Sequence, residues 1–401
     1  MKLIETILND MKKVSKPQKK FLLKAIQAFL SIGGKLTFSN MCRYVGLCEK
    51  TFARQFSKQF CFAEFNQKLL AGVSGKDTEL AVAFDPFFMP KSGGNTHGLG
   101  KFWSGGNGRV EKGLEASVLC IVDLVQRTAY ALSSKQTPTT EEIKKLNPHD
   151  QETSRIDWFV SYVTSLIPFF PSGVKHILVD AYFFKEKFVA GMCEAGLYVV
   201  SKLRKDARLI SLYMGPQKVR GRRKKFGEAL SFDGLPEIIT EDQDVVLKSS
   251  VAHSMALNRT IQVVLVRKKL SNNRVMEALL FTTDLALTPL KVYEFYTARF
   301  QIEFVIRDAK QYMGLTHCQS RKGERIDFHI NLSFLAFNIA KVKELERSGG
   351  TFLNTRCSIA SQHVMHHNEM LMESFFPKFG LDICVFKSTP GYQQALGFVK
   401  N

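Results

Sequence analysis

The first 70 residues carry apolar side chains at the spacing of amphipathic helices. The clearest set lies on one helical face: Phe21, Leu22, Ala25, Ile26 and Phe29. Gly33-Gly34 then ends this helix, because two successive glycines are poor helix formers and common helix terminators. The sequence therefore predicts a helical region that is separate from the rest of the chain.

Residues 36–58 predict a second helical unit. It consists of a short helix, a turn at Gly46, and another helix with Phe52 and Phe56 on its inner face. The outer face of the second helix carries three basic residues, Lys50, Arg54 and Lys58. This arrangement is typical of a helix-turn-helix, whose second helix enters the major groove of DNA, although an ordinary helical hairpin has the same pattern.

From residue 79 the hydrophobic pattern changes to that of β-strands. Apolar runs at 79–85, 113–123 and 126–133 predict an antiparallel meander, and a glycine-rich loop separates the first two runs. The first strand is expected to end at Asp85.

Helices and strands alternate in the next part of the chain. A helix is expected at 152–167, followed by the short apolar strand HILVD, which ends at Asp180. Another helix at 183–195 and a strand at 197–204 come after it. Together with the meander, these elements predict a mixed α/β sheet.

Residues 202–225 hold ten basic residues and one acid. Such a run is usually a solvated tail, but this one lies in the middle of the chain. Three strand-like segments follow at 245–254, 259–269 and 275–284, with SNNR as a hairpin turn before the last. The sequence therefore predicts a structured, basic, β-rich insertion.

The segment YTARFQIEFVIRDAK, residues 296–310, predicts a helix that begins at the Thr288-Pro289 cap. On a helical wheel Arg299, Glu303 and Lys310 fall within an arc of about 60°, and apolar residues cover much of the remaining circumference. We expect a mostly buried helix with one narrow polar edge. Buried charge needs a partner, which is either an internal salt-bridge network or a ligand.

The charge balance of the 401-residue chain favours a polyanionic partner. There are 56 Lys and Arg against 37 Asp and Glu, a net charge of +19, which points to nucleic acid first and an anionic membrane surface second. No apolar run reaches the roughly 18 residues of a membrane span, and no secretory signal is evident. The eight cysteines form no CxxC pair and are typical of buried thiols in a reducing cytoplasm.

Three carboxylates occupy positions where chemistry is common. Asp85 and Asp180 each follow an apolar strand, and Glu303 lies on the polar edge of the predicted helix. If the strands are neighbours and the helix crosses their ends, the acids converge, and their repulsion calls for hard divalent cations such as Mg²⁺ or Mn²⁺. Two such ions suit phosphodiester cleavage and strand transfer.

The spacing Tyr296-x2-Arg299-x3-Glu303-x6-Lys310 resembles the YREK signature of insertion-sequence transposases of the insertion sequence four family, which have an Asp-Asp-Glu active site. The surrounding order is also similar, with AFDPFFMPKSGG around the first acid, LVDAYF around the second, and a β insertion before the third. The likeness covers about residues 36–345. Many relatives have Trp where this chain has Phe300.

The resemblance implies a ribonuclease-H-like catalytic core in which Asp85, Asp180 and Glu303 hold two Mg²⁺ or Mn²⁺ ions. It also implies that Tyr296, Arg299 and Lys310 hold the end of the transposon DNA. The other residues expected to bind DNA are Lys50, Arg54, Lys58, Arg222, Arg223, Lys224 and Lys225.

The sequence thus predicts a cytoplasmic, nucleoid-associated bacterial transposase that binds terminal inverted repeats, cleaves the ends and joins them to target DNA as a dimer. The alternatives are a host nuclease without strand transfer and an inactive DNA-binding regulator. The expected domains are a helix-turn-helix domain (1–75), the two parts of the catalytic domain (76–204 and 286–345), the basic insertion (205–285) and a C-terminal helical region (346–401).

Overall fold

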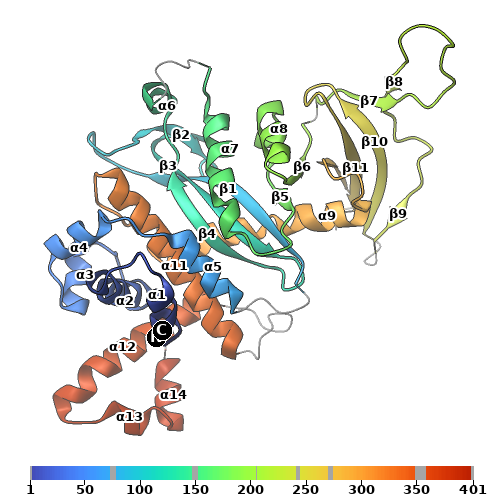
Figure 1. Cartoon of the computed structure of the whole chain (residues 1–401). Helices are drawn as coiled ribbons and strands as arrows, with labels where there is room; N and C mark the ends of the chain where they lie inside the picture. The colour runs from blue at the N-terminus through green and yellow to red at the C-terminus, as the bar shows by residue number, and fades with distance from the viewer. Residues whose placement is uncertain are drawn as a thin grey trace.

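A mixed sheet runs through the molecule, and helices cover both faces of its central part (Figure 1). The computed structural model describes residues 2–72, 78–146, 152–204, 206–240, 244–269, 274–347 and 358–398. These residues contribute twelve strands to the sheet. The predicted mixed α/β class is therefore confirmed.

The part of the sheet that comes first in the chain has five main strands in the order β4-β3-β1-β5-β6. Their bounds are β1 (Leu80–Pro90), β3 (Arg109–Asp123), β4 (Thr128–Gln136), β5 (His176–Leu178) and β6 (Tyr198–Lys202). Strands β1, β3 and β4 pair antiparallel, whereas β5 pairs parallel with both β1 and β6. The meander is confirmed, and the mixed arrangement fits a ribonuclease-H-like fold.

The first strand does not end at Asp85 as predicted. Strand β1 continues to Pro90, because β3 pairs with it along its whole length, from Leu80 opposite Asp123 to Pro90 opposite Gly113. On its other side β1 pairs with β5 only at Val82 and Ala83. The glycine-rich loop also contains a strand that the sequence did not predict, β2 (Gly100–Ser104), which pairs with β3.

The insertion extends the same sheet through β12, which pairs antiparallel with β6. Its strands are β7 (Leu209–Leu212), β8 (Phe226–Ala229), β9 (Ile238–Ile239), β10 (Val245–Ser254), β11 (Arg259–Lys269) and β12 (Val275–Thr282). The three predicted strands are confirmed as β10, β11 and β12, while residues 271–273 of the SNNR turn lie outside the described residues. Arg222–Lys225 lie in the exposed connection between β7 and β8, which projects from the molecule (Figure 1).

Alternation along β1 assigns the helices to the two faces of the sheet. Phe84 packs against Phe159 of α7 (Arg155–Leu166), with ring centroids 5.7 Å apart. Phe87 points the other way and packs against Phe334 of α11 (Gly323–Arg347), at 5.8 Å. The other α-helices between β4 and α11 in the chain are α6 (Thr140–Leu146), α8 (Glu186–Glu194), α9 (Pro289–Ala298) and α10 (Gln301–Tyr312).

Helices at the two ends of the chain lie together (Figure 1). They are α1 (Lys2–Asp10), α2 (Lys16–Ser31), α3 (Phe38–Val45), α4 (Glu49–Phe56), α5 (Phe62–Ala71), α12 (Ile359–Phe375), α13 (Ile383–Phe386) and α14 (Pro390–Leu396). Of this group, α2, α4, α5 and α12 contact α11. Gly46 joins α3 to α4 in the left-handed conformation, with φ of 66°. Phe52 and Phe56 are fully buried as predicted, but Lys58 follows α4 rather than lying on it.

The cysteines are less buried than predicted. Cys120 is buried, but Cys48, Cys61 and Cys384 are exposed. In the described part of the chain, no helix combines the length and the apolar character that crossing a membrane requires.

Helix α11 binds the outer edge of β4 through two asparagines seven positions apart. Asn331 accepts from the backbone N–H of Ser134 at 2.8 Å and donates to its carbonyl at 2.6 Å. Asn338 does the same at Ala131, with distances of 3.0 and 2.7 Å, and also donates to Asn66 of α5 at 2.9 Å. These side chains satisfy backbone groups that an edge strand would otherwise leave unpaired.

Replacing Asn338 with alanine should destabilise the protein by about 2–4 kcal/mol, because it removes the hydrogen bonds that Asn338 makes to both backbone groups of Ala131 and to the buried Asn66 side-chain oxygen. Ser333→Ala is the matched control, since the buried Ser333 hydroxyl bonds only to its own helix at the His329 carbonyl; it should cost about 1 kcal/mol or less. Urea unfolding measures both values. Equal losses would contradict the role assigned to Asn338.

Candidate active site

Asp85 lies within β1, and Asp180 lies two residues after the end of the neighbouring parallel strand β5. Strands β1 and β5 pair with Val82 opposite Ile177 and Ala83 opposite Leu178. Asp85 and Asp180 each follow the last of these pairs by two residues. Asp85 thus lies where β1 loses its β5 partner, in the interior of β1 rather than at its end.

The backbone after β5 is fixed around Asp180. Asp180 caps a short 3₁₀ helix, η2 (Ala181–Phe183), and its carboxylate accepts from the backbone N–H of Tyr182 at 3.0 Å. The Ser201 hydroxyl of β6 donates to the Asp180 carbonyl at 2.9 Å. These two hydrogen bonds tie the residue to a defined position beside β1.

The sequence predicted one long helix with Glu303 near its middle. In the structure Glu303 lies in the first turn of a separate helix, α10. Thr288 does cap α9 by accepting from the Lys291 N–H, but α9 ends at Ala298. At the junction the N–H groups of Phe300, Ile302 and Glu303 bond to carbonyls three residues back, at 3.1–3.2 Å. The chain tightens there to the geometry of a 3₁₀ turn before α10 begins.

The expectation of a mostly buried helix is met only in part. Phe300 is 46% exposed and Phe304 is 44% exposed. These two residues are four positions apart and share one side of the helix, whereas Ile302, Val305 and Ile306 form its buried face.

The pKa values show that the three acids act on one another. The pKa of Asp85 is raised to about 7, first by burial and then by the charge of Asp180; Arg299 opposes the shift and Glu303 adds to it. The pKa of Asp180 is also raised, first by burial and then by Glu303, while the Tyr182 N–H and Arg299 lower it. The site therefore concentrates negative charge that its surroundings disfavour.

Arg299 is a cation that directly contacts one of these acids. Its side chain is 7% exposed and pairs with Glu303 at 2.9 Å. The guanidinium lies over the rings of Tyr296 and Phe300, at 5.7 and 5.0 Å from their centroids. Its Nε atom is buried and has no hydrogen-bond partner.

Lys310 is a half-buried ammonium near the same site. Its Nζ lies 5.7 Å from the centroid of Phe87, which is two positions after Asp85 on β1. Burial lowers the pKa of Lys310. Among the described residues no carboxylate pairs with Lys310. Its ammonium group has therefore lost contact with water without gaining a counter-ion.

The donor chemistry at the acids fits a hard divalent cation, because three carboxylates supply only oxygen ligands and one of them has a pKa of about 7. In the described part of the chain, no three His, Cys, Asp or Glu side chains are grouped so that they could hold a metal ion as they stand. Arg299 instead provides the positive charge at Glu303. The three carboxylates are therefore of a type that binds metal ions, but in this arrangement Glu303 forms an ion pair with Arg299.

A fourth acid, Glu115 of β3, was missed by the sequence reasoning. It is 8% exposed, its pKa is raised by burial, and its charge adds to the shift at Asp85. Glu115 pairs with Arg155, whose Nε is buried without a partner. The only signal in the sequence is one acid inside the apolar run 113–123.

The predicted basic residues are not gathered around the acids. Lys50 and Arg54 are exposed on α4, and Lys58 is exposed just beyond it. Arg222–Lys225 lie at the opposite end of the molecule in the connection between β7 and β8 (Figure 1). If these residues bind DNA, they do so at some distance from the acids.

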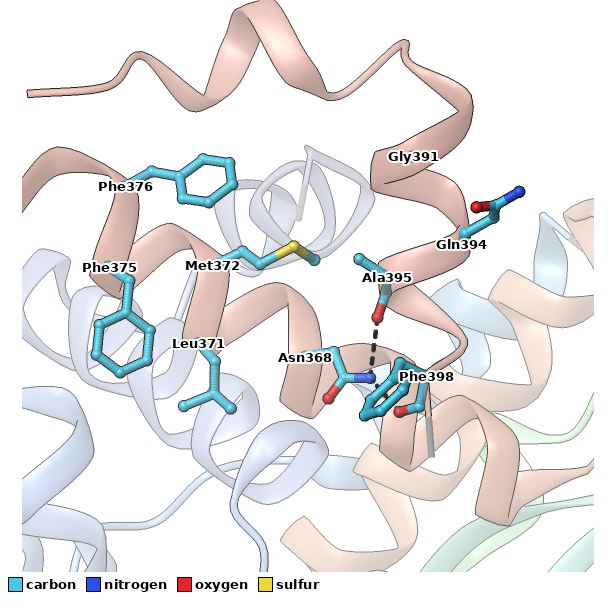
Figure 2. Close-up of a pocket in the computed structure, with 9 residues that line it drawn as sticks. All are labelled: Asn368, Leu371, Met372, Phe375, Phe376, Gly391, Gln394, Ala395 and Phe398. Atoms are coloured by element: carbon cyan, nitrogen blue, oxygen red, sulfur yellow. Dashed lines mark hydrogen bonds between the residues drawn. The ribbon is translucent and has the colours of Figure 1, made fainter. Parts of the chain in front are cut away.

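A cavity of about 500 Å³ between α12 and α14 has a different character (Figure 2). Leu371, Met372 and Phe375 line one side, and the Asn368 amide donates to the carbonyls of Ala395 and Phe398 at 3.2 and 2.8 Å. None of the residues that line it is ionisable. The candidate chemistry is therefore at the acids and not in this cavity.

Comparison with known proteins finds a family match over less than half of the chain. Residues 156–339 match the family model described as the transposase DDE domain. This segment contains Asp180, Glu303 and the insertion between them, and it supports a DDE transposase. No curated protein matches the chain.

Asp85→Asn should raise the melting temperature at pH 8 without added metal by roughly 2–5 °C. Because the folded pKa of about 7 is above the unfolded value of 3.8, the charged carboxylate costs stability, and that cost grows as pH rises through 7. Mg²⁺ should raise the melting temperature of the natural protein, and raise that of the variant much less.

Asp123→Asn is the control, because burial also raises the pKa of Asp123 but this residue pairs with Leu80 at the far end of β1. It should keep the full response to Mg²⁺. An equal Mg²⁺ response in Asp85→Asn would contradict the assignment of Asp85 to a cation site.

Proposed function

We propose that this protein is a DNA transposase that binds the terminal inverted repeats of an insertion sequence, cleaves the DNA at those ends and joins the freed 3′ hydroxyls to target DNA. The observation that carries the proposal is the closeness of Asp85, Asp180 and Glu303, whose charges act on one another beside Arg299. The match of residues 156–339 to the transposase DDE domain supports it.

The three acids would be the metal ligands of this reaction. Two Mg²⁺ or Mn²⁺ ions, when bound there, would neutralise the repulsion between the acids and polarise a phosphodiester for attack. Asp85 and Asp180 supply carboxylates from adjacent strands, and Glu303 supplies one from α10. Because the pKa of Asp85 is about 7, a bound cation would favour its charged form near neutral pH.

Arg299 and Lys310 would bind DNA phosphates next to the cut. Both are cations with reduced access to water, and a phosphate would give Lys310 the counter-ion that the described residues do not provide. Arg299 is held by Glu303, so it would exchange one carboxylate for a phosphate when the acids bind metal. Tyr296, whose ring lies against Arg299, would position the terminal nucleotide.

The finer assignment is to the insertion sequence four family, because the YREK spacing runs through Tyr296, Arg299, Glu303 and Lys310 without a gap. Cleavage at paired ends implies a dimer in the DNA complex. A host nuclease would use the same acids but would need no inverted repeats beside its gene. An inactive regulator would need the DNA-binding residues and no coupled carboxylates.

Substitution of Asp180 should separate binding from chemistry. Asp180→Asn keeps an oxygen for the Tyr182 N–H and removes the charge, whereas Asp180→Ala removes both. Each variant should still bind labelled DNA from the ends that flank the gene, and each should lose cleavage in Mg²⁺ by at least about a hundredfold. A gel shift and a cleavage gel measure the two properties, and retained cleavage would remove Asp180 from the site.

The helix-turn-helix assignment is tested at Arg54, which is exposed on α4. Arg54→Gln should weaken binding to the same end DNA by about fivefold or more and reduce its salt dependence. Arg267→Gln removes an equal charge from a surface residue that pairs with Glu277 on β12, and it should leave end binding nearly unchanged. Equal effects of the two substitutions would show a general charge effect instead of recognition by α4.

A further inference from the structure

The hairpin formed by β2 and the start of β3 has two faces of opposite character. Strand β1 pairs with β3 only from Gly113 onward, so β3 residues 109–112 and β2 extend beyond it as a two-stranded ribbon. On one face Phe102 is 5% exposed and lies 5.6 Å from the Arg155 guanidinium at the start of α7. This face is therefore packed against the molecule.

The other face is open and combines an aromatic ring with two positive charges. Trp103 is 62% exposed, and its cross-strand partner Val110 is 59% exposed. Lys101 and Lys112 are exposed and directly opposite each other on the same face. Like charges in this position destabilise a strand pair, and an exposed tryptophan gains nothing from the fold.

The positive charges on this face are not neutralised. Arg109 is on the opposite face of the ribbon, where its side chain is exposed and pairs with Glu111 at 2.8 Å; Asn107 also bonds to Glu111. No such pairing exists for Lys101 or Lys112 in the described part of the chain. The open face is thus positive and aromatic, whereas the opposite face of the same ribbon is balanced.

The open face continues the side of the sheet on which Asp85 lies. Asp85 is opposite Val118 on β3, and alternate β3 residues from Val118 through Leu114 to Lys112 and Val110 share one face. The eight residue steps from Val118 to Val110 span about 27 Å. Leu114, Ala116 and Val118 are buried, so only the ribbon part of this face, at Lys112 and Val110, is open to a ligand.

We propose that the open face of the β2–β3 hairpin binds a DNA strand with unpaired bases, with Trp103 stacked on one base and Lys101 and Lys112 on the flanking phosphates. Every base has an aromatic face that can stack on tryptophan, and duplex bases already use both faces. A positively charged strand pair carrying one aromatic ring supplies both parts of such a contact. The inference rests on the proposed function, because a transposase opens DNA near the cut.

The test uses Trp103 as its own reporter in the full-length protein. The chain has two tryptophans, and Trp158 stacks on Tyr162 at 5.4 Å on α7. In a Trp158→Phe background, a 30-nucleotide single strand of mixed sequence should quench the Trp103 fluorescence. The matching blunt duplex should bind with little quenching. Equal quenching by both would overturn the preference for unpaired bases, and no quenching by the single strand would overturn the contact itself.

Substitutions separate the contribution of base stacking to the affinity from the contribution of the positive charges. Trp103→Ala should weaken single-strand binding about tenfold, whereas Trp103→Phe should recover most of it. Lys101→Gln with Lys112→Gln should lower the salt slope of log affinity by about 1.4, at 0.7 per phosphate contact on a single strand. Arg109→Gln is the matched control on the opposite face and should leave the affinity unchanged; a loss equal to that of the lysine pair would contradict the proposal.

Two further outcomes separate this inference from its premise. If the natural protein cleaves the flanking end DNA while Trp103 stays unquenched, the hairpin contact fails and the transposase stands. If Trp103 is quenched by the single strand but no DNA is cleaved in Mg²⁺, the contact stands and the proposed function fails. A fluorescence change with protein concentration in the absence of DNA would assign the face to a second copy of the chain and overturn the proposal.

Discussion

Repulsion between carboxylates is the constraint on which the site depends. The fold places Asp85 on β1 and Asp180 just after the neighbouring strand β5, with the Glu303 charge near both, and burial penalises the charges of Asp85 and Asp180. A protein under no functional demand would separate these groups, since each uncompensated buried charge reduces stability. The compensation available within the chain is Arg299, and one guanidinium cannot balance three carboxylates.

The rest of the fold provides a frame rigid enough to hold that unfavourable arrangement. Helix α11 is buried along most of its length and fixes the edge of β4 through Asn331 and Asn338. On the opposite face α7 packs on β1 through aromatic contacts around Phe84. Because strand β1 is held from both faces, Asp85 cannot relax away from its neighbours by moving the strand.

Strands and helices with a strong period were predictable from the sequence, because tertiary contacts reinforce the local pattern there. The meander, α7, α8, β6 and the three long strands of the insertion follow this rule. The end of β1 was not predictable, since Asp85 and Pro86 resemble a strand end, and only the partner strand β3 extends the pairing to Pro90. Strand β2 was hidden for the same reason, as its glycine-rich surroundings carry no alternation signal.

The candidate site could be predicted as a set of residue types but not as a geometry. The spacing of Arg299 and Glu303 indicated that the two share a helical face, and they do form an ion pair. The 3₁₀ turn between α9 and α10 depends on backbone hydrogen bonds that no residue type in YTARFQ demands. The helical wheel groups Phe300 with Phe304, but it does not show which apolar side of the helix meets the core. Glu115 was missed because its importance comes from β3 lying beside β1, which is a tertiary fact.

The turn between α9 and α10 also determines how Arg299 and Glu303 are held differently. A continuous α-helix would carry Tyr296, Arg299 and Glu303 forward at 100° per residue, whereas the tighter turn rotates Glu303 relative to α9. Arg299 lies inside the turn, against the rings of Tyr296 and Phe300, with almost no exposure. Its guanidinium is therefore positioned by aromatic contacts that do not depend on Glu303. That independence lets the ion pair open when another cation approaches the acids, without loss of the position of the arginine.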